Sequence, residues 1–429
     1  MDGSKTLDYQ GNWRDIFQNW EALAHAYPSF IESMIHKFLN ATTFDGYNPY
    51  RVTKDGFDWE TIEPDDPWSY IGYWGDHQII YLLKLLEFSE KYFPSSLSNS
   101  LSEEHFVYAN VPYQIKGYDD ILKNPKDTID FDHELDQKIR EKRSAIGADG
   151  ALLEGKDQSI YQVNFVEKML ASVLAKLSNF IPEGGIWMNT QRPEWNDANN
   201  ALVGNGVSMV TLYYLRRFLH FFKELLTKAS IKSVDISEEL LQFYEGIFET
   251  FDQNKHLLAG SIKGANAKLI LDGLGKAGSD YRLHIYSEPF SGTKKSIDLA
   301  DLVRFVELSI EYLEHSIRAN ERQDNLYHAY NIVSFSEDFD SLQIDYLSEM
   351  LEGQVAALSS GYLSSKETLA VLDGMKSSRL FRPDQYSYML YPNKQLPLFQ
   401  EKNNIPASLV EKSALLGQLV HDGDLQIIE

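Results

Sequence analysis

The chain has no cysteine among its 429 residues. Disulfides, thiolate zinc sites, iron–sulfur clusters and cysteine nucleophiles are therefore excluded. Positive charge is also scarce, because 40 Lys and Arg residues stand against 63 Asp and Glu residues and give a formal net charge of −23. A surface this negative repels phosphate backbones and anionic headgroups, so we expect neither nucleic acid nor a membrane as a partner.

Long apolar runs are missing as well. No stretch approaches the roughly 20 apolar residues of a membrane span. The residues that follow Met1 contain no apolar core of a secretory signal. These absences predict a cytoplasmic protein.

Common catalytic and metal-binding motifs are also absent. The 11 histidines are scattered without an H-E-x-x-H pair, and there is no G-x-S-x-G elbow or Walker A motif. Segment 273–278, G-L-G-K-A-G, matches the dinucleotide fingerprint in its letters, but a strand-like pattern at 281–286 follows where that fingerprint needs a helix. We interpret 273–278 as a glycine-rich hairpin turn, and we expect no cofactor and no metal.

What the chain does contain is an ordinary globular mixture, 43% apolar and 24% charged, with strong helical periodicity. Apolar residues recur at intervals of three and four, which predicts amphipathic helices. Pro28 suits the first position of the second helix. The predicted helices are 12–24, 28–38, 75–92, 131–145, 160–180, 206–227, 237–253, 297–320, 346–359 and 365–376.

The helices are expected to pair within one domain. Segment 206–227 is apolar nearly all round, which predicts burial on several sides, as in the inner ring of a double-layered helical barrel. Residues 95–158 are Ser-rich and then strongly charged, which predicts a loop-rich excursion with one exposed helix. We predict a single all-α domain over residues 1–429, decorated by a small β-hairpin formed from 268–271, 281–286 and 330–335.

Tryptophan is unevenly placed, because all seven Trp residues precede residue 200. Segment 184–200 alone combines two Trp, four Asn, one Arg and two carboxylates, and similar clusters occur at 65–77, 12–15 and 45–50. Aromatic faces carry sugar rings, while carboxylates and amides bind hydroxyl groups. The alternative is that the tryptophans fill the core and that Asp15, Asp76 and Asp197 cap helices, where a carboxylate contributes about 1 kcal/mol.

The run from 185 to 222, G-I-W-M-N-T-Q-R-P-E-W-N-D-A-N-N-A-L-V-G-N-G followed by an apolar helix, resembles the catalytic loop of the cellobiose and chitobiose phosphorylases. That family carries G-D-W-N-D-G-M-N at this place. The resemblance implies that Asp197 is the general acid that protonates the glycosidic oxygen, with Trp195 lining the pocket. Together with the paired helices, it favours an (α/α)6 barrel of six helical hairpins.

Three further segments are similar to motifs of the same family. Trp13-Arg14-Asp15 resembles its R-D-x-x-Q-D, Tyr73-Trp74-Gly75-Asp76 its W-x-D-D-x-x-W-L, and Glu352-Gly353-Gln354 its late Q-x-W-x-x-x-S-G. These matches imply further sugar ligands. The substrate-binding candidates are Trp13, Arg14, Asp15, Trp74, Asp76, Trp187, Arg192, Glu194, Trp195, Asn196 and Gln354.

The chain also departs from the family. Glu194 replaces the first Asp of D-W-N-D, and neither the N-terminal β-sandwich domain nor the later phosphate-site motif is recognisable. We therefore expect either a fragment of a longer protein or a relative that uses water as the attacking group. Inverting hydrolysis needs a base carboxylate roughly 6.5–9.5 Å from the acid, and Glu352 and Glu401 are the candidates.

These observations predict an inverting glycoside hydrolase that acts on an oligosaccharide or glycoside. Two alternatives stay open at this point: a glycoside phosphorylase that uses inorganic phosphate, and a non-catalytic glycan-binding or scaffold protein.

Overall fold

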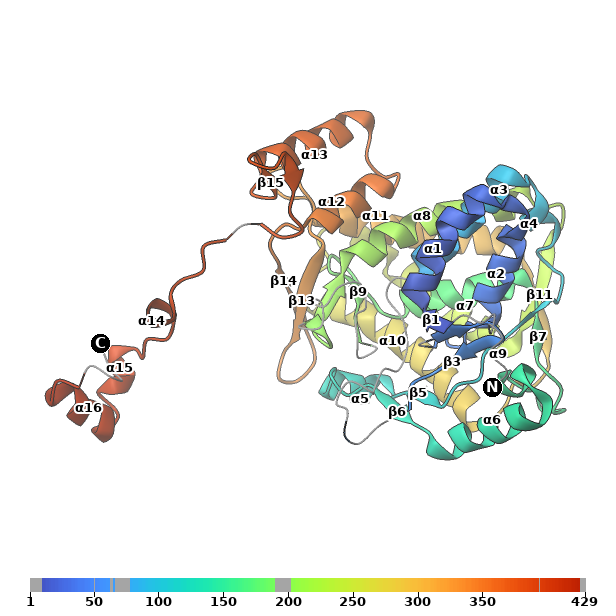
Figure 1. Cartoon of the computed structure of the whole chain (residues 1–429), viewed down its shortest axis with the longest axis horizontal. Helices are drawn as coiled ribbons and strands as arrows, with labels where there is room; N and C mark the ends of the chain where they lie inside the picture. Colours follow the sequence, from blue (N-terminus) through green and yellow to red (C-terminus); the bar gives the residue numbers. More distant parts are fainter. Residues whose placement is uncertain are drawn as a thin grey trace, which may run out of the picture.

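The computed structural model describes residues 10–49, 51–61, 65, 78–189, 202–392 and 394–424. The protein is a mixed α/β structure with 54% helix and 15% strand (Figure 1). Within these ranges, no helix is long and apolar enough to cross a membrane.

A helix stands in each segment that was predicted from apolar periodicity. Short 3-10 turns at Pro28–Phe30, Ala148–Ala151 and Lys255–Ala259 accompany them. The helices are α1 Trp13–Ala26, α2 Ile31–Asn40, α3 Gln78–Tyr92, α4 Ser96–Asn99, α5 Tyr118–Lys123, α6 His133–Ile146, α7 Phe165–Leu177, α8 Met209–Lys228, α9 Glu238–Asn254, α10 Gly264–Ser287, α11 Leu299–Ala319, α12 Leu351–Ser359, α13 Ser365–Ser377, α14 Phe399–Lys402, α15 Ala407–Val410 and α16 Ala414–His421.

The strands are short and form several small antiparallel sheets. They are β1 Gln10–Asn12, β2 Arg51–Thr53, β3 Gly56–Asp58, β4 Phe106–Val107, β5 Tyr113–Ile115, β6 Ile129–Phe131, β7 Gln162–Val163, β8 Phe180–Ile181, β9 Gly185–Trp187, β10 Gly206–Ser208, β11 Ser233–Ser237, β12 Lys294–Asp298, β13 Tyr330–Phe335, β14 Leu342–Tyr346, β15 Phe381–Arg382 and β16 Ser387–Tyr388.

The prediction of an all-α protein built as an (α/α)6 barrel is wrong. The main sheet has five antiparallel strands in the order β14-β13-β10-β9-β8, and several two- and three-stranded sheets accompany it. Most of these strands are only two to five residues long, too short for alternation to show beside the helical pattern. Of the three segments predicted as strands, 330–335 is confirmed as β13, whereas 268–271 and 281–286 are wrong because both lie within helix α10.

The five-stranded sheet joins distant parts of the chain. β9 pairs with β10 through Trp187 and Val207, and β10 pairs with β13 through Gly206 and Ile332. β13, with the sequence Y-N-I-V-S-F, is rich in the β-branched and aromatic residue types that favour strands. The sheet therefore fixes both ends of the connection between β9 and β10.

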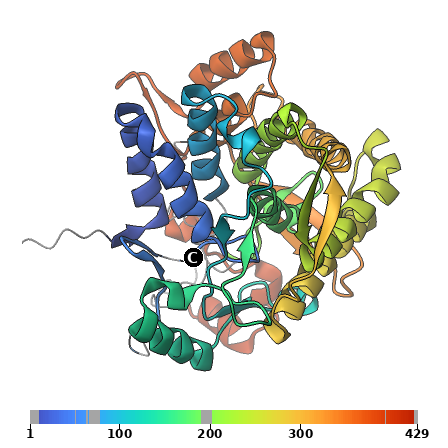
Figure 2. The same ribbon diagram turned by 90° about the vertical axis from the view of Figure 1, so that its right-hand side faces the viewer.

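The centre of the body is α7. All thirteen of its residues are buried, because it packs against α9, α10 and β11. α8 is buried along most of its length and packs against α11, α12 and α3. Figure 2 shows α1 and α2 side by side, with α3 next to them. The predicted burial of segment 206–227 is confirmed, although α7 is the more enclosed helix.

The expected hairpin turn at 273–278 is also wrong, because this segment lies within helix α10. Its glycines permit close approach of neighbouring elements. A Cβ at Gly275 would lie 2.3 Å from the ring of Tyr118, and a Cβ at Gly273 would lie 2.6 Å from Thr250. The same segment is not a dinucleotide site, since it lies inside the helix and not at the turn before one.

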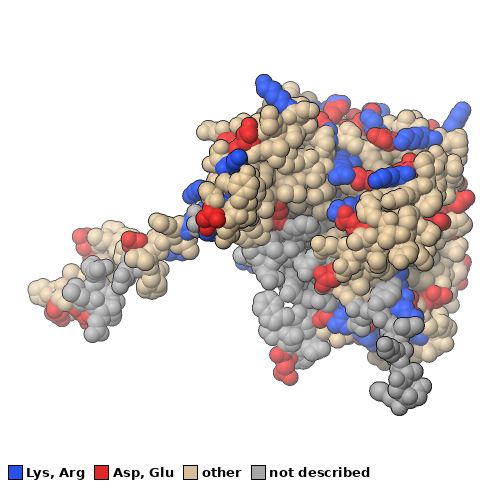
Figure 3. Space-filling model, turned by 45° about the horizontal axis from the view of Figure 1, so that its top comes forward, with Lys and Arg blue, Asp and Glu red and all other residues tan. Residues whose placement is uncertain are grey.

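Two regions frame the body. Residues 95–158 contain β4 to β6, α5 and α6, and Ile139 is the buried residue of α6. The segment that carries α14, α15 and α16 lies apart from the body (Figure 1). On the face in Figure 3, acidic and basic side chains are interspersed. On that face, the acidic excess is not gathered into one patch.

The half-buried His328, just before β13, is expected to make the stability of the protein sensitive to acid. Its Nδ1 lies 3.0 Å from the carbonyl oxygen of Leu347, and its ring stacks on Tyr346. Burial lowers the pKa of His328 below 6.5. The unfolded chain therefore binds a proton more readily than the native protein, so the contribution of His328 to stability is complete above pH 6.5 and falls as the pH drops toward its native pKa.

We expect the melting temperature of the unmodified protein to fall more between pH 7 and pH 5 than that of His328→Gln. The measurement is thermal unfolding across this range, with the exposed His256→Gln as the matched control. Parallel losses in the wild-type protein and in both variants would contradict the assignment.

Candidate functional site

Half of the residues predicted to act on the substrate lie outside the described residues. This holds for Asp197 and its neighbours, and for the segment before α3; the side chain of Arg14 is likewise not described. The residues concerned are Trp74, Asp76, Arg192, Glu194, Trp195, Asn196 and Asp197. Their roles stay predictions.

The described tryptophan candidates are core residues. Trp13 is 1% exposed and packs in an aromatic cluster with Phe17 and Phe38. Trp187 is 3% exposed, and its Nε1 donates to the carbonyl oxygen of Gly204 at 2.7 Å. Both side chains therefore support the alternative interpretation of tryptophan as core filling.

Asp15 belongs to the start of α1. Its backbone N–H donates to Oδ1 of Asn12, and its Oδ2 accepts from Nδ2 of Asn12 at 2.8 Å. Asn12 is the N-cap. Asp15 therefore helps to fix the first turn of the helix, and its carboxylate interacts favourably with the positive end of the helix dipole.

The two candidate bases lie in different settings. Glu352 is buried in α12, where Tyr330 donates its hydroxyl to Oε2 at 3.5 Å. Glu401 lies in α14, in the segment apart from the body, and its Oε2 accepts from the backbone of Leu398 (Figure 1). The structure does not bring these two carboxylates together.

Gln354 is fully buried, and its amide is bound to backbone groups. Its Oε1 accepts from Tyr327 N at 2.8 Å, and its Nε2 donates to Tyr327 O and Met350 O at 2.8 and 2.9 Å. These contacts join α12 to the chain just before β13. They favour a structural role over the sugar contact that the resemblance implies.

We expect Gln354→Ala to lower the free energy of unfolding by about 2–4 kcal/mol, because it leaves buried backbone groups without partners. Urea unfolding measures the loss. The exposed Gln385→Ala is the control and is expected to change stability by less than about 0.5 kcal/mol. A stable Gln354→Ala variant with weakened sugar binding would instead support the ligand role.

Seven buried polar side chains gather at the C-terminal end of α7, and we call them the α7 polar cluster. They come from the turn before residue 50, the start of α3, the ends of α7 and β9, and the middle of α10. The members are Asp45, Tyr47, Gln78, Lys176, Asn179, Asn189 and Arg282.

Gly46 allows the turn at residues 43–47 to lie directly against α7. Its φ is +78°, and a Cβ there would lie 2.5 Å from the carbonyl oxygen of Ala171. A side chain would therefore push the turn away from the helix. This close contact brings Asp45 and Tyr47 to the end of α7.

Amide groups link the α7 polar cluster. Nδ2 of Asn179 donates to the hydroxyl of Tyr47 at 2.8 Å, and Nδ2 of Asn189 donates to Oδ1 of Asn179 at 2.7 Å. Gln78 donates Nε2 to Gly46 O at 2.8 Å and accepts from Nζ of Lys176 at 3.4 Å. Residues far apart in sequence are thus held together by side-chain hydrogen bonds.

The cluster also brings together the ends of the segments that carry the predicted site. Asn189 is the last described residue before 190–201, and Gln78 is the first after 66–77. Asn189 binds Asn179, and Gln78 binds Lys176. Lys176 precedes Asn179 by only three residues in the chain. Gln78 and Asn189, the described residues that adjoin these two segments, therefore belong to one buried polar network.

The charged members of the cluster are two cations, Lys176 and Arg282, and one carboxylate, Asp45. Burial raises the pKa of Asp45, although hydrogen bonds from Thr43 and Tyr286 act in the opposite direction. Burial raises the pKa of Tyr47 to about 12, and the nearby charge of Arg282 opposes this shift. Nζ of Lys176 lies 4.7 Å from the centre of the Tyr47 ring.

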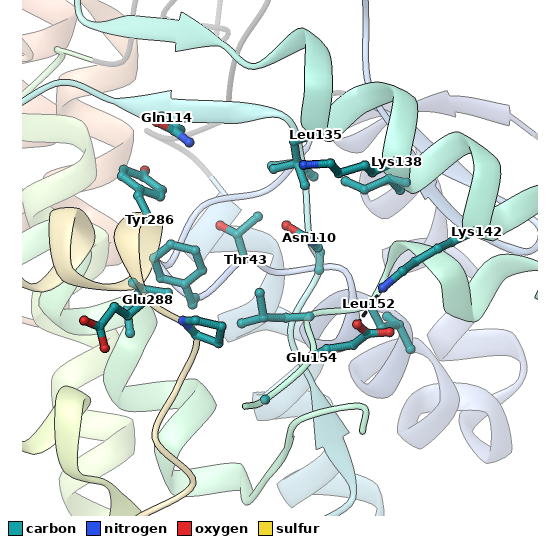
Figure 4. A pocket seen from close by; sticks show the side chains of 18 of the residues that line it. Thr43, Asn110, Gln114, Leu135, Lys138, Lys142, Leu152, Glu154, Tyr286 and Glu288 are labelled. Atoms are coloured by element: carbon teal, nitrogen blue, oxygen red, sulfur yellow. Dashed lines mark hydrogen bonds and ion pairs between the residues drawn. The ribbon is translucent and has the colours of Figure 1, made fainter. Parts of the chain in front are cut away.

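A pocket of about 470 Å³ adjoins the cluster (Figure 4). Thr43 and Tyr286, the two hydrogen-bond partners of Asp45, also line this pocket. Lys142 and Glu154 form an ion pair of 2.5 Å on another wall. The volume lies in the range of small-ligand sites, and the lining mixes amides, charges and apolar groups.

Sequence reasoning identified only part of this arrangement. The cluster at 45–50 pointed to the turn that carries Asp45 and Tyr47. Lys176 lies in a predicted helix and Arg282 in segment 281–286, which was predicted as a strand, and neither belongs to a motif. The described ranges contain no group of three or more His, Asp or Glu side chains placed to hold a metal ion.

No protein-family model matches the chain, and no curated protein matches it.

Proposed function

We propose that the protein is a carbohydrate-active enzyme that cleaves a glycosidic bond with inversion, with Asp197 as the general acid and water as the attacking group. The observation that carries the proposal is that Gln78 and Asn189, which adjoin segments 66–77 and 190–201, both form hydrogen bonds within the α7 polar cluster. These two segments hold Trp74, Asp76, Trp195 and Asp197, the residue types that bind and protonate a glycoside.

Two further features support a sugar ligand. The cluster supplies amide and hydroxyl groups on a rigid base, and such groups position polar ligands well when their own partners are fixed. Asn110 and Gln114 line the neighbouring pocket, and Gln114 lies near the aromatic ring of Tyr286 (Figure 4). Amides beside an aromatic ring suit a hydroxyl-rich ring better than an apolar ligand.

The test is a panel of α- and β-linked disaccharides incubated with the full chain, with and without inorganic phosphate. We expect release of free sugar with inverted anomeric configuration in both buffers, followed by NMR spectroscopy. A sugar phosphate formed only in the phosphate buffer would show that the reaction is phosphorolysis and not hydrolysis. Binding without turnover would indicate a glycan-binding protein instead of an enzyme. The proposal would be overturned if the chain neither bound nor cleaved any of the disaccharides.

A further inference from the structure

Arg282 is a buried cation for which the described residues provide no hydrogen-bond partner. The residue is 7% exposed, and its Nε is buried with no partner. In the described part of the chain, no hydrogen bond and no ion pair within 4.0 Å involves its guanidinium group. Buried arginines are normally paired, because removing a guanidinium from water without compensating hydrogen bonds is costly.

The surroundings of Arg282 explain its position but leave its donors unused. A Cβ at Gly278 would lie 3.2 Å from Nη1 of Arg282 and 2.8 Å from Cβ of Ser178. The small residue thus places the guanidinium group beside the end of α7. The positive charge acts on Asp45 and Tyr47 through space, while Thr43 and Tyr286 occupy the carboxylate oxygens of Asp45.

A second cation lies in the same cluster. Lys176 is 2% exposed and stands over the ring of Tyr47, the residue on which Arg282 also acts. Asp45 is the carboxylate among the seven cluster members, and its two oxygens accept from Thr43 and Tyr286.

We propose that Arg282 binds an oxyanion in the α7 polar cluster, either inorganic phosphate or the carboxylate of an acidic sugar. The planar guanidinium group presents parallel N–H donors that match two oxygens of either group. The hydroxyl of Tyr47 and the charge of Lys176 lie in the same cluster. Binding of the anion stands apart from catalysis, whereas its use in a reaction rests on the proposed function.

The experiment compares thermal unfolding of the full chain in inorganic phosphate, in glucuronate and in chloride at equal ionic strength. We expect phosphate or glucuronate to raise the melting temperature of the wild-type protein. Arg282→Met should abolish this shift, and Arg282→Lys should weaken the apparent affinity about ten- to hundredfold. Lys276→Met, exposed on the same helix, is the control for a general loss of charge and should keep the shift.

A second readout separates the proposal from a purely structural role. If an anion normally neutralises Arg282, Arg282→Met should be at least as stable as the wild-type protein in chloride. If Asp45 and the negative end of α7 alone hold Arg282, the variant should be destabilised in every buffer and the anion shift should be equal in both proteins. That result would overturn the proposal.

The comparison of phosphate with glucuronate identifies which kind of anion binds to Arg282. A shift with phosphate alone supports inorganic phosphate as the ligand, and a shift with glucuronate alone supports an acidic sugar. A shift with neither anion overturns the proposal. Because turnover is not measured, anion binding can succeed where glycoside cleavage fails, and the reverse also holds. Arg282→Lys keeps the test valid if Arg282→Met does not fold.

Discussion

Asp197→Asn is expected to reduce kcat for a natural disaccharide by about 10²–10⁴-fold, the usual contribution of general acid catalysis. The amide has nearly the same shape as the carboxylic acid but cannot give a proton to the departing sugar oxygen. The measurement is the initial rate of sugar release at the pH optimum. The melting temperature should be unchanged, which separates lost chemistry from lost folding.

The choice of substrate makes this prediction specific. A nitrophenyl glycoside has a leaving group that needs little protonation, so Asp197→Asn should retain far more of its activity on that substrate than on a disaccharide. Glu194→Gln, in the same segment, is the control and should not show this dependence on the leaving group. Equal losses on both substrates would assign Asp197 to another role.

Glu167→Ala is expected to lower the free energy of unfolding by about 3–5 kcal/mol. Glu167 lies in α7 with its side chain fully buried. Its carboxylate accepts from the hydroxyl of Tyr108 at 3.3 Å, from Ser237 N at 3.0 Å and from Nζ of Lys294 at 3.3 Å. Without it, the buried donors Tyr108 and Ser237 lose this acceptor, whereas Nζ of Lys294 can still donate to the carbonyl oxygen of Gln162.

The control uses the same cation. Glu104 lies 3.9 Å from Nζ of Lys294 but is half exposed, so Glu104→Ala should cost less than about 1 kcal/mol. Urea unfolding followed by far-ultraviolet circular dichroism measures both variants. A loss of similar size in the two variants would show that burial of Glu167 does not determine its contribution.

The sequence predicted the helices well because their apolar periodicity repeats over several turns. α10 was the exception, since Gly273, Gly275 and Gly278 resemble turn residues. In the structure these glycines instead make room for Thr250, Tyr118 and Ser178. Packing against neighbours decides between the two interpretations, and such neighbours are not visible in one segment of sequence.

The candidate site was predictable only in part. The Trp- and Asn-rich segments could be recognised by composition, but composition did not separate Trp13 and Trp187, which are buried, from residues that touch a ligand. Arg282 shows the converse case. Its position depends on the close approach of Gly278 to Ser178, which is distant in sequence, so no local pattern marks Arg282 as a candidate.

The five-stranded sheet has a consequence for the order in which the protein is made. Residues 190–201 connect β9 to β10, and β10 gains its second partner only from β13, more than 120 residues later. Contacts this distant close slowly, since a long loop must first be ordered. On the ribosome, the support of that connection is therefore completed only after β13 and β14 have emerged. Before then the five-stranded sheet lacks β13 and β14, the two strands beyond β10.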